Sequence, residues 1–283
     1  MNRELLLDIT KIAFHKWLSQ NSFLQSAALA YFIILPLPLL LLIILGMLSL
    51  IYGQGDAFQA FIQQITTVAG PSVAELFQQL LDAIITPFTS FFASLVALAF
   101  TVLGAIGAFG VLQETMNSIW KVTKQKVGLS ERIEHKLIPF LLVSVLGFAI
   151  MVWTGFSTVL LGFISLALEP FSSIVEPVLR IIQIGLSFIL STVLLAIIYK
   201  EVPDLDVQWR DVGLAAIITG LIFTTTNYLF GIILEIVTFT SLTGAAGSIL
   251  ILLPWLFFIN SIILYGATLS KVYTEKLGSF SAK

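Results

Sequence analysis

The chain has 283 residues, of which 58% are hydrophobic and only 11% are charged, whereas soluble domains carry about 25% charged residues. The formal net charge is −2, and the absence of cysteine excludes disulfides, thiolate metal sites and cysteine nucleophiles. The composition excludes an ordinary soluble protein and indicates a membrane protein, for which lipid is the solvent of most residues.

The N-terminal segment, residues 1–20, predicts an amphipathic helix on the cytoplasmic face of the membrane. Apolar residues recur at helical spacing, with charged residues between them. The segment lacks the uninterrupted apolar run and the small-residue cleavage site of a signal peptide. We therefore expect the first membrane span to act as an uncleaved targeting signal.

Six apolar runs follow, each longer than the roughly 20 residues that a helix needs to cross the hydrocarbon core. They are Ala27 to Tyr52, Phe88 to Leu112, Leu137 to Leu168, Val178 to Tyr199, Val212 to Val237 and Gly247 to Leu269. This pattern predicts an all-α polytopic membrane protein. Residues 21–275 would form a six-helix transmembrane domain, and residues 276–283 a cytoplasmic tail.

The basic residues are sorted by side. Of the 14 Lys and Arg residues, only Arg180 falls on the side opposite to all the others. The positive-inside rule assigns the basic side to the cytoplasm. We therefore expect a multi-pass protein of the plasma (inner) membrane, with the N-terminus and the C-terminus both in the cytoplasm.

The outer loop between the first two spans, Gly53 to Pro87, carries two apolar stripes separated by a Gly70-Pro71 turn. We expect two amphipathic helices folded over the outer mouth of the bundle. Helices that only anchor the loop in the membrane interface are the alternative.

The second span carries Gly104, Gly107 and Gly110 at a spacing of three. Small residues on one helical face let a neighbouring helix approach closely. We favour tight helix packing over a flexible gate, and we expect Gly107→Leu to lower stability in detergent sharply. After Leu112 the same helix becomes polar and ends at Trp120, an interface anchor.

Two amides lie near the middles of consecutive spans, Asn227 in the fifth and Asn260 in the sixth. An amide left unsatisfied in lipid costs on the order of several kcal/mol, so both are expected to point inward. The candidate cavity-lining residues are Asn227, Asn260, Gln183, Ser187, Thr224, Ser261 and Tyr265. They form either a solute site or interhelical hydrogen bonds, and both interpretations stay open.

Catalytic chemistry is not expected. The two histidines, His15 and His135, lie among surface-type residues, and no hydrolase or metal-binding motif accompanies them. No basic platform with stacked aromatic residues indicates a nucleic-acid partner. We therefore expect no catalytic residues, no cofactor and no metal site. The lack of a firmly mid-membrane charge also argues against a proton-relay pump.

Three stretches carry a resemblance to a known family. They are AALAYFIILPLPLLLL from Ala27, GVLQETMNSIWKV from Gly110, and the region from Tyr199 through Leu269, which includes YKEVPDLDVQWRDV and TGAAGSILILLPWLFFINSIILYGATL. Together they resemble the YihY/BrkB family of bacterial and archaeal membrane proteins. The resemblance implies a six-helix inner-membrane protein, of a family linked to virulence and formerly mislabelled a ribonuclease.

The positions that match the family's motifs are Tyr31, Gln113, Asn117, Trp120, Pro203, Trp209, Asp211, Gly247, Pro254, Trp255 and Gly266. Two features depart from the family pattern. The last span often ends in Gly-Ala-Glu, where this chain has Gly266-Ala267-Thr268, and the prolines of the first span are shifted. A mechanism that needs that carboxylate is in doubt for this chain.

The functional prediction is a transporter- or permease-like protein for an unidentified small solute. The alternative is a non-catalytic membrane scaffold or envelope-integrity factor. A transporter needs a polar cavity that reaches the middle of the membrane, whereas a scaffold can be packed shut. The expected partners are the lipid bilayer and the solute, with a homo-oligomer left open.

Overall fold

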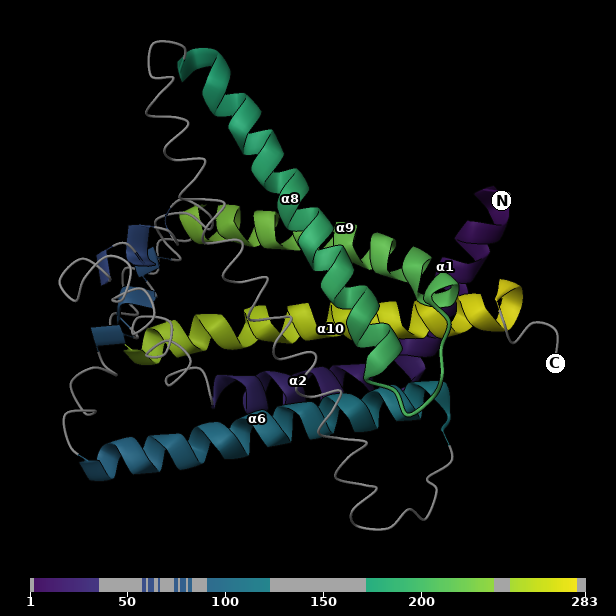
Figure 1. Ribbon diagram of the computed structural model, residues 1–283, viewed down its shortest axis with the longest axis horizontal. Coiled ribbons are helices and arrows are strands. Elements are labelled where there is room, and N and C mark those ends of the chain that lie inside the picture. The colour runs from purple at the N-terminus through teal and green to yellow at the C-terminus, as the bar shows by residue number, and fades with distance from the viewer. Residues whose placement is uncertain are drawn as a thin grey trace. The chain divides into compact units, whose positions relative to one another are not determined.

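The protein is all-α wherever the structure describes it. The computed structural model describes residues 3–35, 91–122, 172–236 and 245–278, with a few residues between 58 and 82. Its main helices are α1 (Arg3–Ser19), α2 (Ser22–Ile34), α6 (Phe91–Trp120), α8 (Ser172–Glu201), α9 (Trp209–Ile236) and α10 (Ala245–Leu277) (Figure 1). No strand occurs in these ranges. The predicted all-α class is confirmed.

Three of these helices are long and apolar enough to cross a membrane. The candidate spans are Pro177–Glu201, Trp209–Phe230 and Ile251–Leu277, which coincide with the fourth, fifth and sixth predicted runs. The third run, Leu137 to Leu168, lies outside the described residues, and the first is described only as far as residue 35. Six spans in total therefore stay a prediction.

Two helices extend beyond the apolar runs that predicted them. α6 continues past Leu112 to Trp120, as its polar continuation indicated, and α10 continues past Leu269 to Leu277. Such extensions carry polar side chains on helices that begin as apolar spans. These extensions supply most of the candidate site described below.

The chain divides into two compact units. Unit 1 comprises Met1–Ser22, Leu112–Thr224 and Ile262–Lys283; unit 2 comprises Phe23–Val111 and Thr225–Ser261. The predicted domain boundaries, at residues 20 and 275, instead separate the membrane-spanning part of the chain from its interfacial helix and its tail. They stay a prediction.

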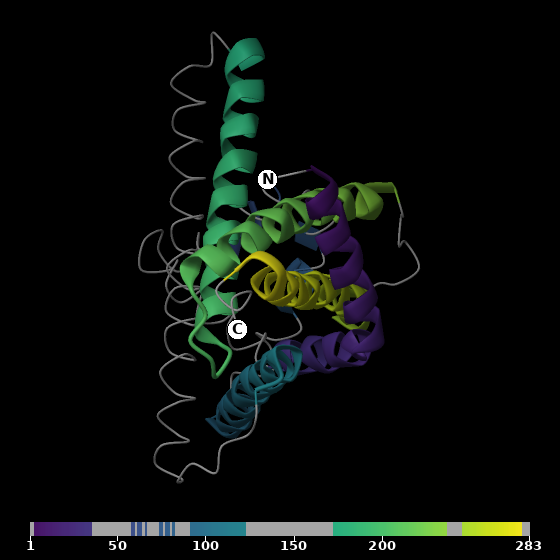
Figure 2. The same ribbon diagram turned by 90° about the vertical axis from the view of Figure 1, so that its right-hand side faces the viewer.

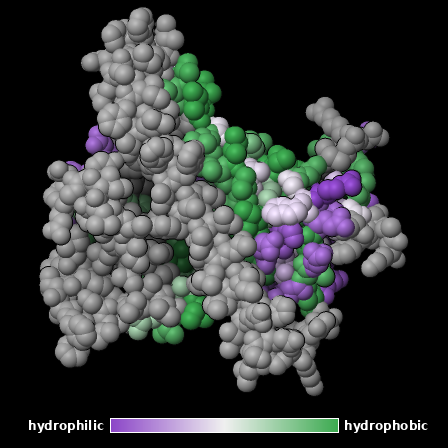
Figure 3. Space-filling model, in the orientation of Figure 1, coloured by the Kyte–Doolittle hydropathy of each residue, from purple (hydrophilic) through white to green (hydrophobic). Residues whose placement is uncertain are grey.

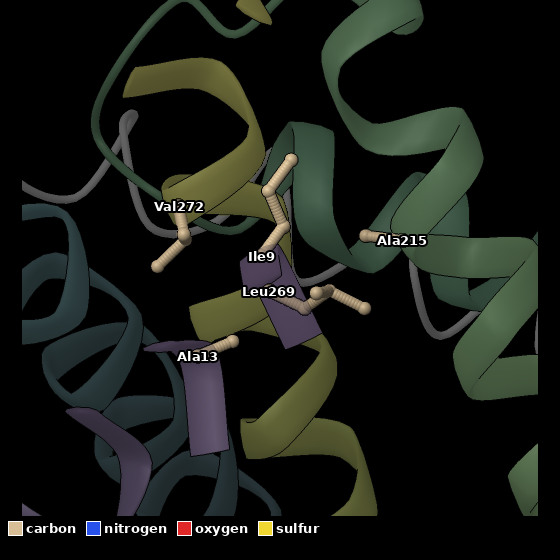
Figure 4. Close-up of a cluster of buried hydrophobic side chains, with 5 residues drawn as sticks. All are labelled: Ile9, Ala13, Ala215, Leu269 and Val272. Atoms are coloured by element: carbon tan, nitrogen blue, oxygen red, sulfur yellow. The ribbon is translucent and has the colours of Figure 1, made fainter. Parts of the chain in front are cut away.

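In unit 1, α1 packs against α9 and α10. Ile9 and Ala13 of α1 are fully buried in a cluster with Ala215 of α9 and with Leu269 and Val272 of α10 (Figure 4). Figures 1 and 2 both show α1 crossing beside the C-terminal part of α10. One apolar face of α1 is therefore covered by protein.

A second face of α1, beside the buried one, is also apolar. Leu7, Phe14 and Leu18 share it and are 53%, 49% and 43% exposed. A helix with one face on protein and an exposed apolar face fits a site at the edge of a bilayer. The placement of residues 1–20 on the cytoplasmic membrane face stays a prediction.

The surface of α8 in unit 1 is strongly apolar. Its large exposed side chains include Val178, Ile181, Ile182, Ile184, Ile189 and Val193. In Figure 3, hydrophobic (green) side chains cover this helix, and hydrophilic (purple) ones gather around the loop that joins α8 to α9. A helix surrounded by lipid needs such an apolar surface.

In unit 2, the described residues between 58 and 82 are helical. Phe61, Ala74 and Leu81 are buried, and the rings of Phe61 and Phe77 meet edge to face with centroids 6.4 Å apart. Phe61 and Leu81 belong to the two apolar stripes predicted in this loop. The described fragments agree with amphipathic helices in this loop.

Candidate functional site

The candidate site is a polar junction in unit 1, built around the C-terminal end of α6. The last turn of α6 closes with two hydrogen bonds: the Lys121 N–H donates to the Ser118 carbonyl (3.2 Å) and the Val122 N–H to the Asn117 carbonyl (2.9 Å). This pair of bonds is a Schellman motif. It leaves the carbonyls that follow these two acceptors in the helix without a backbone donor, so they need other donors.

Two amides of α6 hold a carboxylate from the α8–α9 loop. Gln113 Nε2 donates to Asp204 Oδ1 (2.9 Å), and Asn117 Nδ2 donates to Asp204 Oδ2 (2.7 Å). The Asp204 N–H in turn donates to Asn117 Oδ1 (2.7 Å). Because Gln113 and Asn117 are four residues apart, they lie on one face of α6. The loop is thereby tied to the end of α6.

A lysine of α10 contacts the end of α6. Lys271 is only 5% exposed, and its Nζ donates to the Ile119 carbonyl (2.7 Å). A cation at a helix C-terminus is favoured by the helix dipole and satisfies a carbonyl that the helix leaves open.

Glu275 joins this lysine to α1. Its Oε1 lies 3.5 Å from Lys271 Nζ, and its Oε2 lies 2.8 Å from Lys16 Nζ. The Lys16 and Glu275 side chains are 40% and 42% exposed, so solvent weakens their pairing. Three helices, α1, α6 and α10, thus meet through one carboxylate and two lysines.

Close packing beside the junction explains the motif residue Gly266. Tyr199 is fully buried, and its hydroxyl donates to the Ile263 carbonyl (3.0 Å). A Cβ on Gly266 would overlap the Tyr199 hydroxyl and the Thr219 hydroxyl. Only glycine leaves room for Tyr199 at this point of α10.

Four further motif residues belong to unit 1. Asp211 is 2% exposed, opens α9, and its carbonyl accepts a hydrogen bond from Ser270 Oγ (3.3 Å). Pro203 is buried, whereas Trp209 is exposed with Lys200 Nζ 5.5 Å from its ring centre. Trp120 is buried, and its Nε1 has no hydrogen-bond partner among the described residues.

The two mid-span amides both lie in unit 2. Asn227 is half-buried, and its Oδ1 accepts a hydrogen bond from Trp255 Nε1 (3.1 Å). Asn260 is 3% exposed, and its Nδ2 donates to the Leu256 carbonyl of its own helix (2.8 Å). The neighbouring Ser261 is 6% exposed, and its hydroxyl finds no partner in the part of the chain that the structure describes.

The other candidate cavity residues belong to unit 1. Ser187 and Thr224 are half-buried, and the side chain of Gln183 lies outside the described ones. Tyr265 packs edge-on against the rings of Phe14 and Trp17. The seven residues are therefore divided between two units, and a cavity shared by them stays a prediction.

The glycines of α6 differ in their surroundings. A Cβ on Gly107 would overlap the ring of Phe32 in α2, so close packing is present there. At Gly110 no described atom lies within 4 Å of such a Cβ. Gly104 is buried, and tight packing by all three stays a prediction.

The remaining motif residues of unit 2 are Tyr31, Pro254 and Gly247. Tyr31 is 57% exposed, with its ring edge-on to Phe32. Pro254 is exposed and lies inside α10, which also contains Gly247.

Sequence reasoning missed three participants of the junction: Asp204, Lys271 and Glu275. In the sequence, Lys271 was only one of the basic residues assigned to the cytoplasmic side, and Asp204 was only one of several acidic residues in its loop. One signal was present for the pair on α10, because Lys271 and Glu275 are spaced i, i+4 on a helix. Nothing in the sequence pointed to Asp204 as the partner of the two α6 amides.

The junction is suited to holding helices and a loop together. The Asp204 carboxylate accepts from two amides, and Lys271 donates to a carbonyl. Within the described ranges, no three His, Asp or Glu side chains lie close enough together to hold a metal ion.

These observations define an all-α membrane protein with long apolar helices. The family model named "Virulence factor BrkB" matches residues 13–282, and the chain belongs to this family. The resemblance inferred from the three sequence stretches is thus confirmed.

Among its relatives are proteins described as UPF0761 membrane proteins. That of Azotobacter vinelandii is 24% identical over 268 residues, covering 93% of this chain and 62% of the relative. That of Pseudomonas aeruginosa (strain LESB58) is 22% identical over 271 residues, with the same coverage of 93% and 62%. That of Tolumonas auensis is 26% identical over 186 residues, covering 65% and 58%. The chain therefore spans less than two thirds of these relatives. No solved structure matches it.

Proposed function

We propose that this membrane protein is transporter- or permease-like, acts on a small polar solute, and is not an enzyme. The observation that carries the proposal is the pair Asn260 and Ser261, which are both buried within the candidate span Ile251–Leu277. Buried hydroxyl groups in proteins are nearly always hydrogen-bonded. The unsatisfied Ser261 hydroxyl supports a polar molecule, water or solute, reaching this point.

The second candidate function is a non-catalytic membrane scaffold or envelope-integrity factor. It is favoured by the hydrogen bonds of the two amides. Asn227 is bonded to Trp255 on the neighbouring helix, and Asn260 to its own helix. Amides that already hydrogen-bond within or between helices need no solute as a partner.

Cysteine accessibility separates the two functions, and the chain has no cysteine to remove. Ser261→Cys would be treated in liposomes with a water-soluble methanethiosulfonate reagent. Matched controls on the same helix are Leu252→Cys, at a buried apolar site (3% exposed), and Phe258→Cys, at an exposed apolar site (55%). We expect only the Ser261→Cys thiol to react, because only a polar path brings the reagent to a mid-membrane site.

Equal protection of all three thiols from both sides of the membrane would contradict the transporter proposal and favour the scaffold. If Ser261→Cys reacts, Asn260→Ala is the next variant. It should change the rate of the labelling reaction without loss of the folded protein.

We further propose that the protein lies in the plasma (inner) membrane with both termini in the cytoplasm. The one-sided distribution of Lys and Arg supports this orientation. A membrane-impermeant thiol reagent added to whole spheroplasts should label Ser72→Cys and spare Ser19→Cys. Labelling of Ser19→Cys from outside would reverse the orientation.

A further inference from the structure

Two lysines pair with one carboxylate in unit 1, beside the helix end that carries a third lysine. Lys16 Nζ and Lys271 Nζ lie 2.8 Å and 3.5 Å from the two oxygens of Glu275. Lys271 Nζ also contacts the Ile119 carbonyl, two residues before Lys121. Lys121 directly follows the last residue of α6, so the chain places it beside this contact. Lys16, Lys121 and Lys271 are called the lysine cluster below.

Within the part of the chain that the structure describes, the one carboxylate paired with the lysine cluster does not neutralise it. Counting these three lysines and Glu275 alone, the formal charge is +3 − 1 = +2. Like charges repel more strongly where protein and lipid replace water. A cluster of this kind is stabilised when a further anion binds to it.

Lys121 occupies an unusual backbone position. Its φ of 56° lies in the left-handed region, at the helix-ending position that glycine usually takes. A side chain at such a position is disfavoured, and a residue kept in a disfavoured conformation is a pointer to function. Here lysine in place of glycine adds a positive charge beside Lys271 and Lys16.

The predicted topology places the cluster at the depth of lipid headgroups. Lys271 comes two residues after Leu269, the end of the sixth predicted apolar run, and Lys121 follows Trp120, an interface-anchor residue at the end of α6. Basic pockets between helices at the cytoplasmic end of a bundle suit the phosphate groups of anionic lipids. A phosphate oxygen accepts hydrogen bonds from several ammonium groups at once.

We propose that the lysine cluster binds the phosphate group of an anionic phospholipid in the cytoplasmic leaflet. Lys16 and Lys121, whose side chains reach solvent, contact the phosphate, and the buried Lys271 contributes its charge from behind. The bound lipid offsets the repulsion among the lysines and joins the ends of α1, α6 and α10. This site is independent of the proposed transport function.

Native mass spectrometry of the full chain in a neutral detergent tests the proposal. The probes are phosphatidylglycerol and, as a neutral comparison, phosphatidylcholine. We expect phosphatidylglycerol to be retained in preference. Lys16→Gln and Lys121→Gln should each weaken its binding about fivefold, because one lysine near an anionic surface contributes about 1 kcal/mol. The double variant should lose roughly twenty-five-fold.

Lys11→Gln is the matched control, since it removes one exposed positive charge from α1 outside the cluster. It should leave phosphatidylglycerol binding unchanged, and circular dichroism would check that every variant keeps its helices. An equal loss in Lys11→Gln and Lys16→Gln would overturn the proposal. Inorganic phosphate that binds on its own and displaces the lipid completely would overturn the lipid as the ligand.

Discussion

α8 and α10 are both candidate membrane spans, yet they differ in how much of each is buried. Over its most apolar 18-residue stretch, α8 is only 18% buried, whereas α10 is 56% buried. α8 is the more apolar of the two. The more apolar helix is therefore the more exposed, which reverses the rule for soluble proteins.

The physical reason is the solvent. Lipid tails are as apolar as leucine, so an apolar helix gains little from being covered by protein. Polar groups have no partners in lipid and must find them inside the bundle. On α10, Thr268 and Thr274 are fully buried and donate to carbonyls of their own helix, at 3.0 and 2.8 Å. Polar content thus predicts which of these two helices is the more buried.

The largest expected effect compares a glycine on each helix. Gly266→Ala on α10 would place a methyl group against Tyr199 and Thr219, and Gly185→Ala on α8 would meet no described atom within 4 Å. We expect Gly266→Ala to cost about 3 kcal/mol of unfolding free energy. Gly185→Ala should be neutral or gain up to about 1 kcal/mol from helix propensity. Denaturant unfolding in detergent measures both, and similar losses would break the contrast between the two helices.

The next effect concerns the charged end of α10. Lys271→Met should cost about 2 kcal/mol, because the Ile119 carbonyl loses its donor in a buried place. Lys16→Met removes the partly exposed partner of the same carboxylate, and should cost less than about 1 kcal/mol. Thermal unfolding at low salt compares the two. Equal costs would mean that burial does not distinguish these lysines.

A smaller effect is expected at the loop that follows α8. Asp204→Ala deprives Gln113 and Asn117 of their acceptor and should cost about 1.5 kcal/mol. Asp206→Ala is the control, because its side chain is 99% exposed and its Oδ1 lies as far as 3.9 Å from Lys200 Nζ. No measurable loss of stability is expected for it. Hydrogen exchange of the loop amides should rise in the Asp204 variant alone. Unchanged exchange there would show that the amides of α6 do not hold the loop.

The smallest expected effect is a gain. Lys121→Gly relieves a lysine with φ of 56°, and should stabilise the protein by about 1 kcal/mol in lipid-free detergent. Asn21→Gly, at the end of α1 with φ of 55°, should gain less, because asparagine tolerates this conformation. Thermal unfolding ranks the two variants, and a loss in Lys121→Gly would indicate that its side chain contributes a contact of its own.

Part of the candidate site could be found from the sequence. Gln113 and Asn117 were singled out as motif positions on the polar end of α6, and the helix does run to Trp120. Their partner could not be found, because Asp204 is 91 residues away from Gln113 along the chain. Helical periodicity describes neighbours three or four residues apart and carries no information on such pairs.

The mid-span residues show the same limit. Asn227 was expected to have a hydrogen-bond partner, since lipid offers none, but Trp255 as that partner follows only from the tertiary structure. The small size of Gly107 predicted close helix packing. The Phe32 ring, which leaves no room for a Cβ at Gly107, agrees with that prediction. The same pattern did not distinguish Gly110, which has no described atom within 4 Å of an added Cβ.

The sequence by itself determined the class of the protein, its helical fold and the apolar helices that suit a bilayer. These properties depend on hydropathy and on spacing along the chain, which are local quantities. Only the tertiary structure decided that α10 is the most buried of the three described candidate spans, that Asp204 is held by two amides, and that Lys16 and Lys271 share Glu275. Those contacts join residues far apart in sequence, and their energies depend on distance, burial and hydrogen-bond geometry, which appear only after the helices have packed.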